Sequence, residues 1–148
     1  MNCNDNAGIS GRFHIVLKGS DGQIKEERDI KNVITTAGKT FLAAWLAAAS
    51  QAAPWMNYIG VGTGSTSVSA TDTALEAELT RKAAALTSTT NVWQAQVVFA
   101  AGEGTGLITE SGVLSAASAG TLMSHQTFAA VNKGALDSLQ ITWQITFA

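Results

Sequence analysis

The chain has 148 residues, of which 46% are hydrophobic and only 14% are charged, and its formal net charge is −2 at pH 7. This length fits one domain that can bury a core without disulfides or structural metals, and the single cysteine, Cys3, excludes an intrachain disulfide. Because Lys25, Arg28 and Lys31 are interleaved with acidic residues, they form no basic stripe, and nucleic-acid binding is not expected.

The low charged fraction predicts a surface that packs against other proteins. About a quarter of the residues in an ordinary globular protein are charged. Uncharged groups cost less to desolvate than ions, so such a surface suits contact with neighbours. The alternative is a monomer with a surface rich in Ser and Thr.

The amino terminus has no basic start and no apolar run, so no secretory signal is expected. Residues 41–49 are the most apolar stretch and are too short to span a bilayer. The sequence therefore predicts a soluble protein made in the cytoplasm, without membrane partners. Residues 1–10 are expected to form a flexible arm, and residues 11–148 a single domain.

The first predicted elements are two strands joined by a turn. Apolar residues alternate with others along residues 13–18, which indicates a strand. Residues 19–22 (GSDG) supply a turn. Residues 23–33 return as a polar strand, expected near a sheet edge because charges there discourage unwanted pairing.

The period then changes to that of a helix. Residues 37–49 place apolar side chains three and four apart, with Thr36 as the expected cap and Pro54 as the outer limit. A single amphipathic helix among strands is expected to lie across a sheet or at one end of a sandwich.

The second half is predicted to be mostly strands. Residues 56–61 form a short one, and a glycine-rich loop follows to about residue 71. Thr73 and Glu76 match a capping box, which predicts a helical turn through Leu79. Further strands are expected over residues 92–99, 107–114, 121–128 and 139–147, with a turn at 132–134.

The last of these strands decides the fold class. Five large apolar residues alternate with uncharged polar ones over residues 139–147. This is the pattern of a half-buried antiparallel strand that completes a core. We therefore predict an all-β protein, an antiparallel β-sandwich of the jelly-roll-like kind with one helix.

No set of residues predicts catalysis, a metal site or a cofactor site. His14 and His125 lie in predicted strands without a third ligand at metal-like spacing. Glu103 and Glu110 flank one turn and are weak candidates for paired catalytic carboxylates. Residues 60–64 (GVGTG) follow a strand but lack the lysine of a phosphate-binding loop.

The remaining acidic and aromatic residues have structural interpretations. Asp72, Glu76 and Glu78 suit a helix amino terminus, and Trp45, Trp93 and Trp143 fall on predicted core faces. Trp55 and Tyr58 are the two aromatic residues expected to be exposed and are the candidate partner contacts. For Trp55, packing over the sheet edge is the favoured interpretation, and a partner contact is the alternative.

Several segments, in this order and spacing, resemble small structural proteins of tailed bacteriophages. They are residues 32–34 (NVI), 37–39 (AGK), 58–64 (YIGVGTG), 71–75 (TDTAL) with Glu78 and Leu79, 99–106 (FAAGEGTG), 108–113 (ITESGV), 120–123 (GTLM), 131–134 (VNKG) and 138–147. The resemblance covers residues 32–147. It departs at Ser124 and His125, where such proteins usually carry an arginine.

This resemblance implies a non-enzymatic virion component, made in the bacterial cytoplasm and present on the particle in many copies. Its partners would be major capsid or tail proteins and other copies of itself. Head decoration is slightly favoured over attachment at the tail fibre, collar or baseplate, because the chain has no coiled-coil or repeat stalk. A carbohydrate-binding β-sandwich and a small hydrolase are the alternatives.

Overall fold

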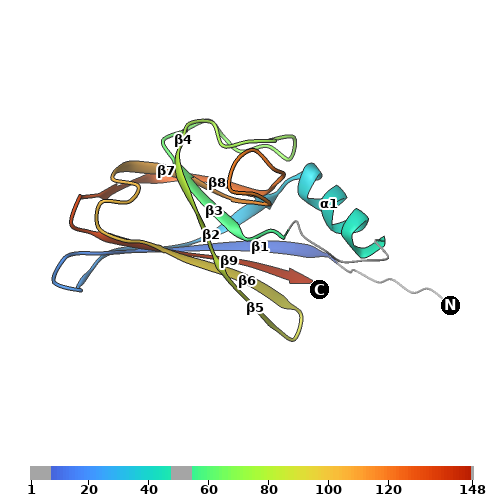
Figure 1. The fold of residues 1–148 in the computed structure, drawn as a ribbon, viewed down its shortest axis with the longest axis horizontal. Coiled ribbons are helices and arrows are strands. Elements are labelled where there is room, and N and C mark those ends of the chain that lie inside the picture. Colours follow the sequence, from blue (N-terminus) through green and yellow to red (C-terminus); the bar gives the residue numbers. More distant parts are fainter. Residues whose placement is uncertain (1–7, 48–54, 148) are drawn as a thin grey trace.

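The computed structural model of the protein describes residues 8–47 and 55–147. This part of the chain contains one helix, α1 (Thr36–Ala47), and is otherwise built of antiparallel strands (Figure 1). The strands are β1 (Ile9–Lys18), β2 (Ile24–Ile34), β3 (Tyr58–Gly62), β4 (Glu78–Ala83), β5 (Ala85–Thr89), β6 (Val92–Phe99), β7 (Gly106–Leu114), β8 (Leu122–Lys133) and β9 (Ser138–Phe147). The prediction of an all-β protein is confirmed.

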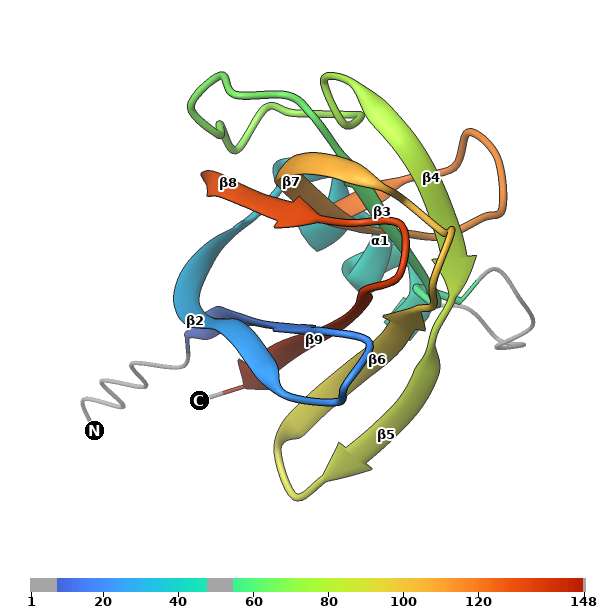
Figure 2. The ribbon, with the colours of Figure 1, turned by 90° about the vertical axis from the view of Figure 1, so that its left-hand side faces the viewer.

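The strands form one sheet that curls into a nearly closed barrel. Their order is β4-β3-β7-β8-β2-β1-β9-β6-β5, and every pairing is antiparallel. The two terminal strands of this order, β4 and β5, are separated only by Ala84, so the chain itself joins the two edges (Figure 2). The jelly-roll-like β-sandwich remains a prediction.

The barrel has a thin seam between β2 and β8. These strands pair only at Val33–His125 and Ile34–Ser124. Beyond this point the side chain of Arg28 crosses the seam and donates hydrogen bonds to the carbonyls of Ala129 and Ala130. The polar strand β2 was expected near an edge. It lies inside the strand order, but most of its outer edge is unpaired.

The core follows the alternation of β9. Leu139, Ile141, Trp143 and Ile145 are all at most 1% exposed, as their spacing predicts, whereas Phe147 is 43% exposed. β9 lies between β1 and β6 and pairs with both along nearly its whole length. The last strand therefore completes the core.

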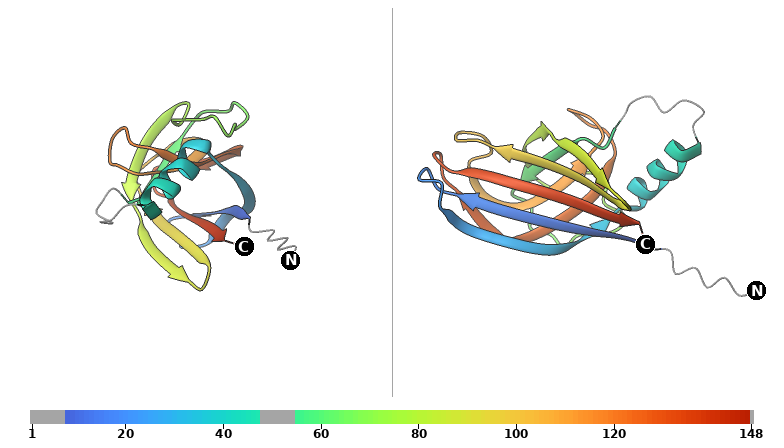
Figure 3. Two further views of the ribbon diagram at one scale, coloured as in Figure 1. Left: turned by 90° about the vertical axis from the view of Figure 1, so that its right-hand side faces the viewer. Right: turned by 90° about the horizontal axis from the view of Figure 1, so that it is seen from below.

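Helix α1 lies at one end of the barrel (Figure 3). Its cap is Thr35 and not Thr36, because the Thr35 hydroxyl oxygen accepts a hydrogen bond of 3.0 Å from the Gly38 N–H. Gly38 is the one buried residue of α1, and a Cβ there would lie 2.6 Å from the Met123 carbonyl oxygen. The predicted helix end and Pro54 fall outside the described residues.

Other boundaries differ from the sequence prediction. No helical turn follows Thr73, since residues 72–77 are irregular and β4 begins at Glu78. Strands β4 and β5 were not predicted, and β8 continues through Lys133, where a turn was expected. β1 begins at Ile9, inside the predicted arm, whose residues 1–7 are outside the described part.

Candidate functional site

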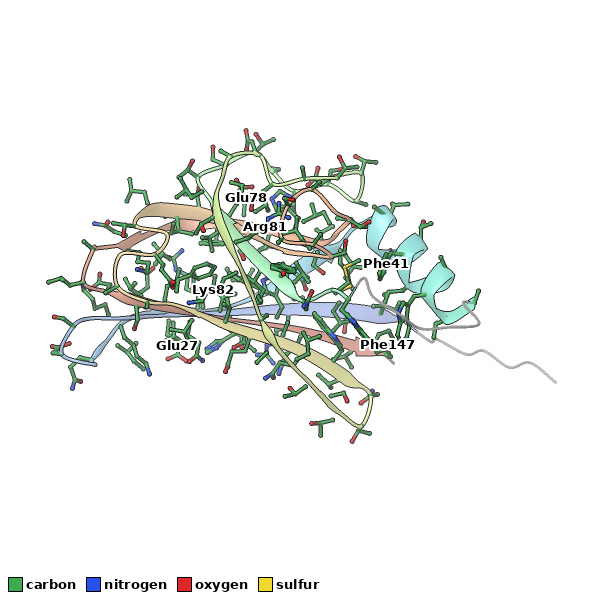
Figure 4. The ribbon with its side chains drawn as sticks, in the orientation of Figure 1. Glu27, Phe41, Glu78, Arg81, Lys82 and Phe147 are labelled. Carbon is green, nitrogen blue, oxygen red and sulfur yellow. The ribbon has the colours of Figure 1, made fainter. Side chains whose placement is uncertain are left out.

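An apolar groove separates α1 from the end of the barrel. Its volume is about 420 Å³. Side chains from the helix, from the segment before β3, from β5 and β6, from the start of β8 and from the end of β9 line it; they are Phe41, Leu42, Trp45, Leu46, Trp55, Met56, Leu86, Thr87, Ser88, Trp93, Met123, Ile145 and Phe147. Figure 4 places Phe41 on α1 and Phe147 on β9 at this same end of the molecule.

Three of the four tryptophans meet at this groove. The rings of Trp45 and Trp55 are 6.0 Å apart between centroids and tilted by 59°. Trp55 is 47% exposed, as a partner contact requires, and the neighbouring Leu46 is 72% exposed. The assignment of Trp45 to the core is wrong, because its helix projects from the barrel end and leaves it half-buried.

The groove carries no charge. None of its lining residues is ionisable, and the segments that supply most of them, residues 40–71, 83–102 and 138–148, contain no Asp, Glu, Lys or Arg. A surface of this kind loses little solvation energy when another protein covers it.

The structure does not bring Tyr58 to the same site. Tyr58 is half-buried on β3 and packs against a small cluster of Leu75, Leu114 and Leu122. Of the two candidate contact residues, Trp55 alone lines the groove.

A buried network of ionisable groups lies elsewhere, beneath the loop between β3 and β4. His125 of β8 is 4% exposed, and its Nδ1 is 2.7 Å from Asp72 while its Nε2 is 3.0 Å from Glu110. His125 therefore links an acid of the loop, Asp72, to an acid of β7, Glu110.

Glu110 is the centre of this network. It is fully buried on β7 and accepts backbone N–H bonds from Gly64, Glu76 and Ala77 at 3.0, 2.9 and 2.7 Å, besides the contact with His125. These four partners fill the acceptor positions of a carboxylate. Glu110 therefore anchors both ends of the loop.

Two glycines of residues 60–64, Gly62 and Gly64, belong to this anchor. A Cβ on Gly62 would lie 2.4 Å from Glu110 Oε1, and one on Gly64 would lie 2.7 Å from it. These glycines allow the buried carboxylate to approach the backbone. This is a structural reason for the motif.

Two further acids of the loop are held in their charged forms. Burial raises the pKa of Asp72, but hydrogen bonds from the Ser69 N–H and from His125 outweigh it, and the net pKa lies below its usual value. Hydrogen bonds from the Thr66 N–H and hydroxyl lower the pKa of Glu76. The Glu76 carboxylate thus holds the loop where a helix cap was expected.

The loop borders a polar pocket of about 380 Å³, lined by Thr66, Ser67, Thr71, Asp72, Thr73, Ala74, Glu76 and His125. Both nitrogens of His125 already face carboxylates, and the acceptor positions of Glu110 are filled. The geometry favours an anchor for the loop over proton transfer. Sequence reasoning missed this network because its members are 15 and 53 residues apart.

The other candidate residues contact ionisable partners away from both the groove and the His125 network. Glu103 binds Lys82 at 2.7 Å, and this contact lowers the pKa of Glu103. Glu78 pairs with Arg81, beside which it lies in Figure 4, and His14 contacts Glu27 at 2.9 Å. Glu103 and Glu110 belong to different networks and share no partner.

The buried lysine Lys133 was not anticipated from the sequence. Lys133 of β8 is fully buried, and its ammonium donates to the carbonyls of Ala100 and Asp137 at 2.9 and 2.8 Å. Burial lowers the pKa of Lys133. Lys133 links the β6–β7 loop, through Ala100, to the β8–β9 loop, through Asp137, at the end of the barrel opposite α1.

In residues 8–47 and 55–147 no three His, Cys, Asp or Glu side chains are grouped so that they could hold a metal ion. Within the same ranges, no helix has the length and hydropathy needed to cross a membrane. No protein-family model, curated protein or solved structure matches this chain.

Proposed function

We propose that this chain is a non-enzymatic structural protein of a tailed-phage virion, present in many copies and covered in part by its neighbours. The observation that carries the proposal is the uncharged apolar groove at the α1 end, where Leu46 and Trp55 are exposed beside the half-buried Trp45. Exposed apolar surface of this kind marks contact sites in soluble proteins.

The sequence resemblance supports the same function. It spans residues 32–147 and includes the segment from the seam through α1 as well as the anchored loop. In this proposal the barrel is a compact sandwich-like unit, and the partners are capsid or tail proteins and further copies of the chain. A position on the head surface remains slightly favoured over the tail.

The groove favours a protein contact over the alternative of carbohydrate binding. Sugar hydroxyls need hydrogen-bond partners when they leave water. Thr87 and Ser88 are the only side chains of the groove lining with hydroxyl groups, and the rest is apolar apart from indole N–H groups. A glycan array that shows saturable binding by the isolated protein would instead favour host-surface recognition.

Purified particles of the encoding phage test the proposal. Quantitative mass spectrometry should find the chain in the particles, at a fixed and repeated ratio to the major capsid or tail protein. A chain found only in the cytoplasm of infected cells would end the proposal. A Glu103→Gln or Glu110→Gln variant that abolished a measured turnover would favour the hydrolase alternative.

A further inference from the structure

The outer edge of β5 is unpaired among the described residues. β5 is the last strand of the sheet order and pairs only with β6. All five of its residues are exposed, none is charged, and three of them line the groove. An uncharged open edge is a template for pairing with another strand.

The register of the β5–β6 hairpin identifies which backbone groups are free. Thr89 and Val92 flank a two-residue turn, so they form a hydrogen-bonded pair, and such pairs then alternate along the hairpin. The N–H and C=O groups of Leu86 and Ser88 therefore point to the outer edge. Ala84 has the same orientation, but its N–H is already bound to the Asn57 carbonyl at 2.7 Å.

The two free residues are symmetric about Thr87. We propose that two copies of the chain join at this edge, with the β5 strands antiparallel and a twofold axis at Thr87. Leu86 of each copy then pairs with Ser88 of the other, and the two Thr87 residues face each other in a non-hydrogen-bonded pair. This inference rests on the proposed function, because it names one partner of the assembling protein.

The lack of charge on β5 favours a second copy of the chain as the partner of its free edge. A strand that pairs with itself places identical residues near one another, and like charges there are destabilising. β5 has no charges, whereas β4 carries Glu78, Arg81 and Lys82, and the unpaired part of β2 carries six charged residues. Of these three strands, β5 is therefore the one that can pair with the same strand of a second copy without bringing like charges together.

The groove adds apolar area to this contact. A stable interface buries about 800 Å² on each partner, more than one short strand supplies. Leu86 and Ser88 lie opposite Ala95 and Trp93 of β6, on the face of the hairpin that is turned to the core, so the pairing brings Leu86 of the second copy beside the groove. The exposed Leu46, Trp55 and Phe147 line the same groove and are available for burial.

Sedimentation of the full chain tests the pairing. The wild type should sediment as a dimer, with twice the monomer mass of 15.3 kDa. Thr87→Lys and Thr87→Glu should each sediment as monomers, because each places two like charges at the axis. An equimolar mixture of the two variants should recover the dimer, since opposite charges then meet.

A matched control uses the same strand and the same substitution. Thr89→Lys faces the uncharged Ala85 of the second copy in the proposed register and should remain dimeric. Circular dichroism verifies that every variant is folded. In a Cys3→Ser background, Thr87→Cys should form a disulfide-linked dimer on oxidation, because a non-hydrogen-bonded pair has Cα atoms about 4.5 Å apart.

The results separate this inference from the proposed function. A wild type that remains monomeric, or folded Thr87→Lys and Thr87→Glu variants that remain dimeric, would overturn the β5 pairing. Particles that contain the chain would still support the virion role in that case. A dimer that behaves as described, with no chain in purified particles, would leave the pairing intact and refute the virion role.

Discussion

Glu110 shows how one buried residue can hold a long loop. Its carboxylate is fully buried and accepts N–H bonds from Gly64, Glu76 and Ala77, which lie at the two ends of the loop. Glu110→Gln replaces one acceptor oxygen with a donor, so at least one backbone N–H loses its partner. We expect a loss of about 2–4 kcal/mol in the free energy of unfolding, measured by urea denaturation.

Glu103→Gln is the matched control for this prediction. The Glu103 side chain is 43% exposed and pairs with an exposed lysine, Lys82. Exposed ion pairs contribute little, so the change in unfolding free energy should be much smaller than for Glu110→Gln. Equal losses in the two variants would contradict the anchoring role of Glu110.

The charged form of Asp72 gives this loop a pH dependence. Its pKa is below the usual value in the folded protein, so Asp72 contributes stability that is present above the unfolded pKa of about 3.9 and is lost as pH falls through the folded pKa. Urea denaturation at several pH values should show Asp72→Asn less stable than wild type at pH 7. The difference should shrink in acid; a constant difference would refute this linkage.

At the scale of elements, the start of α1 depends on one threonine. Thr35 accepts the Gly38 N–H, and its hydroxyl donates to the Leu122 carbonyl at 2.5 Å. Thr35→Ala should cost about 1–2 kcal/mol in urea denaturation, followed by tryptophan fluorescence. Thr35→Ser should be almost as stable as the wild type, because serine keeps the capping hydroxyl. Thr36→Ala should have little effect, because Thr36 is exposed and is not the cap; the reverse order would place the cap at Thr36.

Elements with a strong local pattern could be predicted from the sequence. β9 and β6 alternate apolar and polar residues because each has one face on the core, and their predicted positions agree with the structure. β4 and β5 were missed because residues 78–89 are mostly exposed and show no such alternation. Thr73 and Glu76 predicted a helix because a capping box depends only on local spacing.

The candidate sites were harder to predict because they depend on tertiary contacts. Trp55 follows Pro54 outside any predicted element, and this local signal suggested exposure. Nothing near His125 in the sequence indicates Asp72 or Glu110 as its partners. They meet because β8 pairs with β7 and the loop folds over both strands.

At the scale of the whole molecule, the strands of the barrel differ in how completely they are paired. β9 is paired along both edges, whereas β2 shares only two residue pairs with β8, and one edge of β5 has no partner among residues 8–47 and 55–147. Amide hydrogen exchange should therefore be slowest in β9 and faster for the amides of β2 that face the seam. Exchange in β9 as fast as at the seam would contradict the described pairing.

The proposed function requires that other copies and other virion proteins cover the uncharged α1 end of this barrel. Electron cryo-microscopy of intact particles of the proposed phage tests this requirement most directly. The account predicts density for the chain at regular positions, with the groove around Trp55 buried against a neighbouring protein. Particles without this chain, or with the groove facing solvent in every copy, would contradict it.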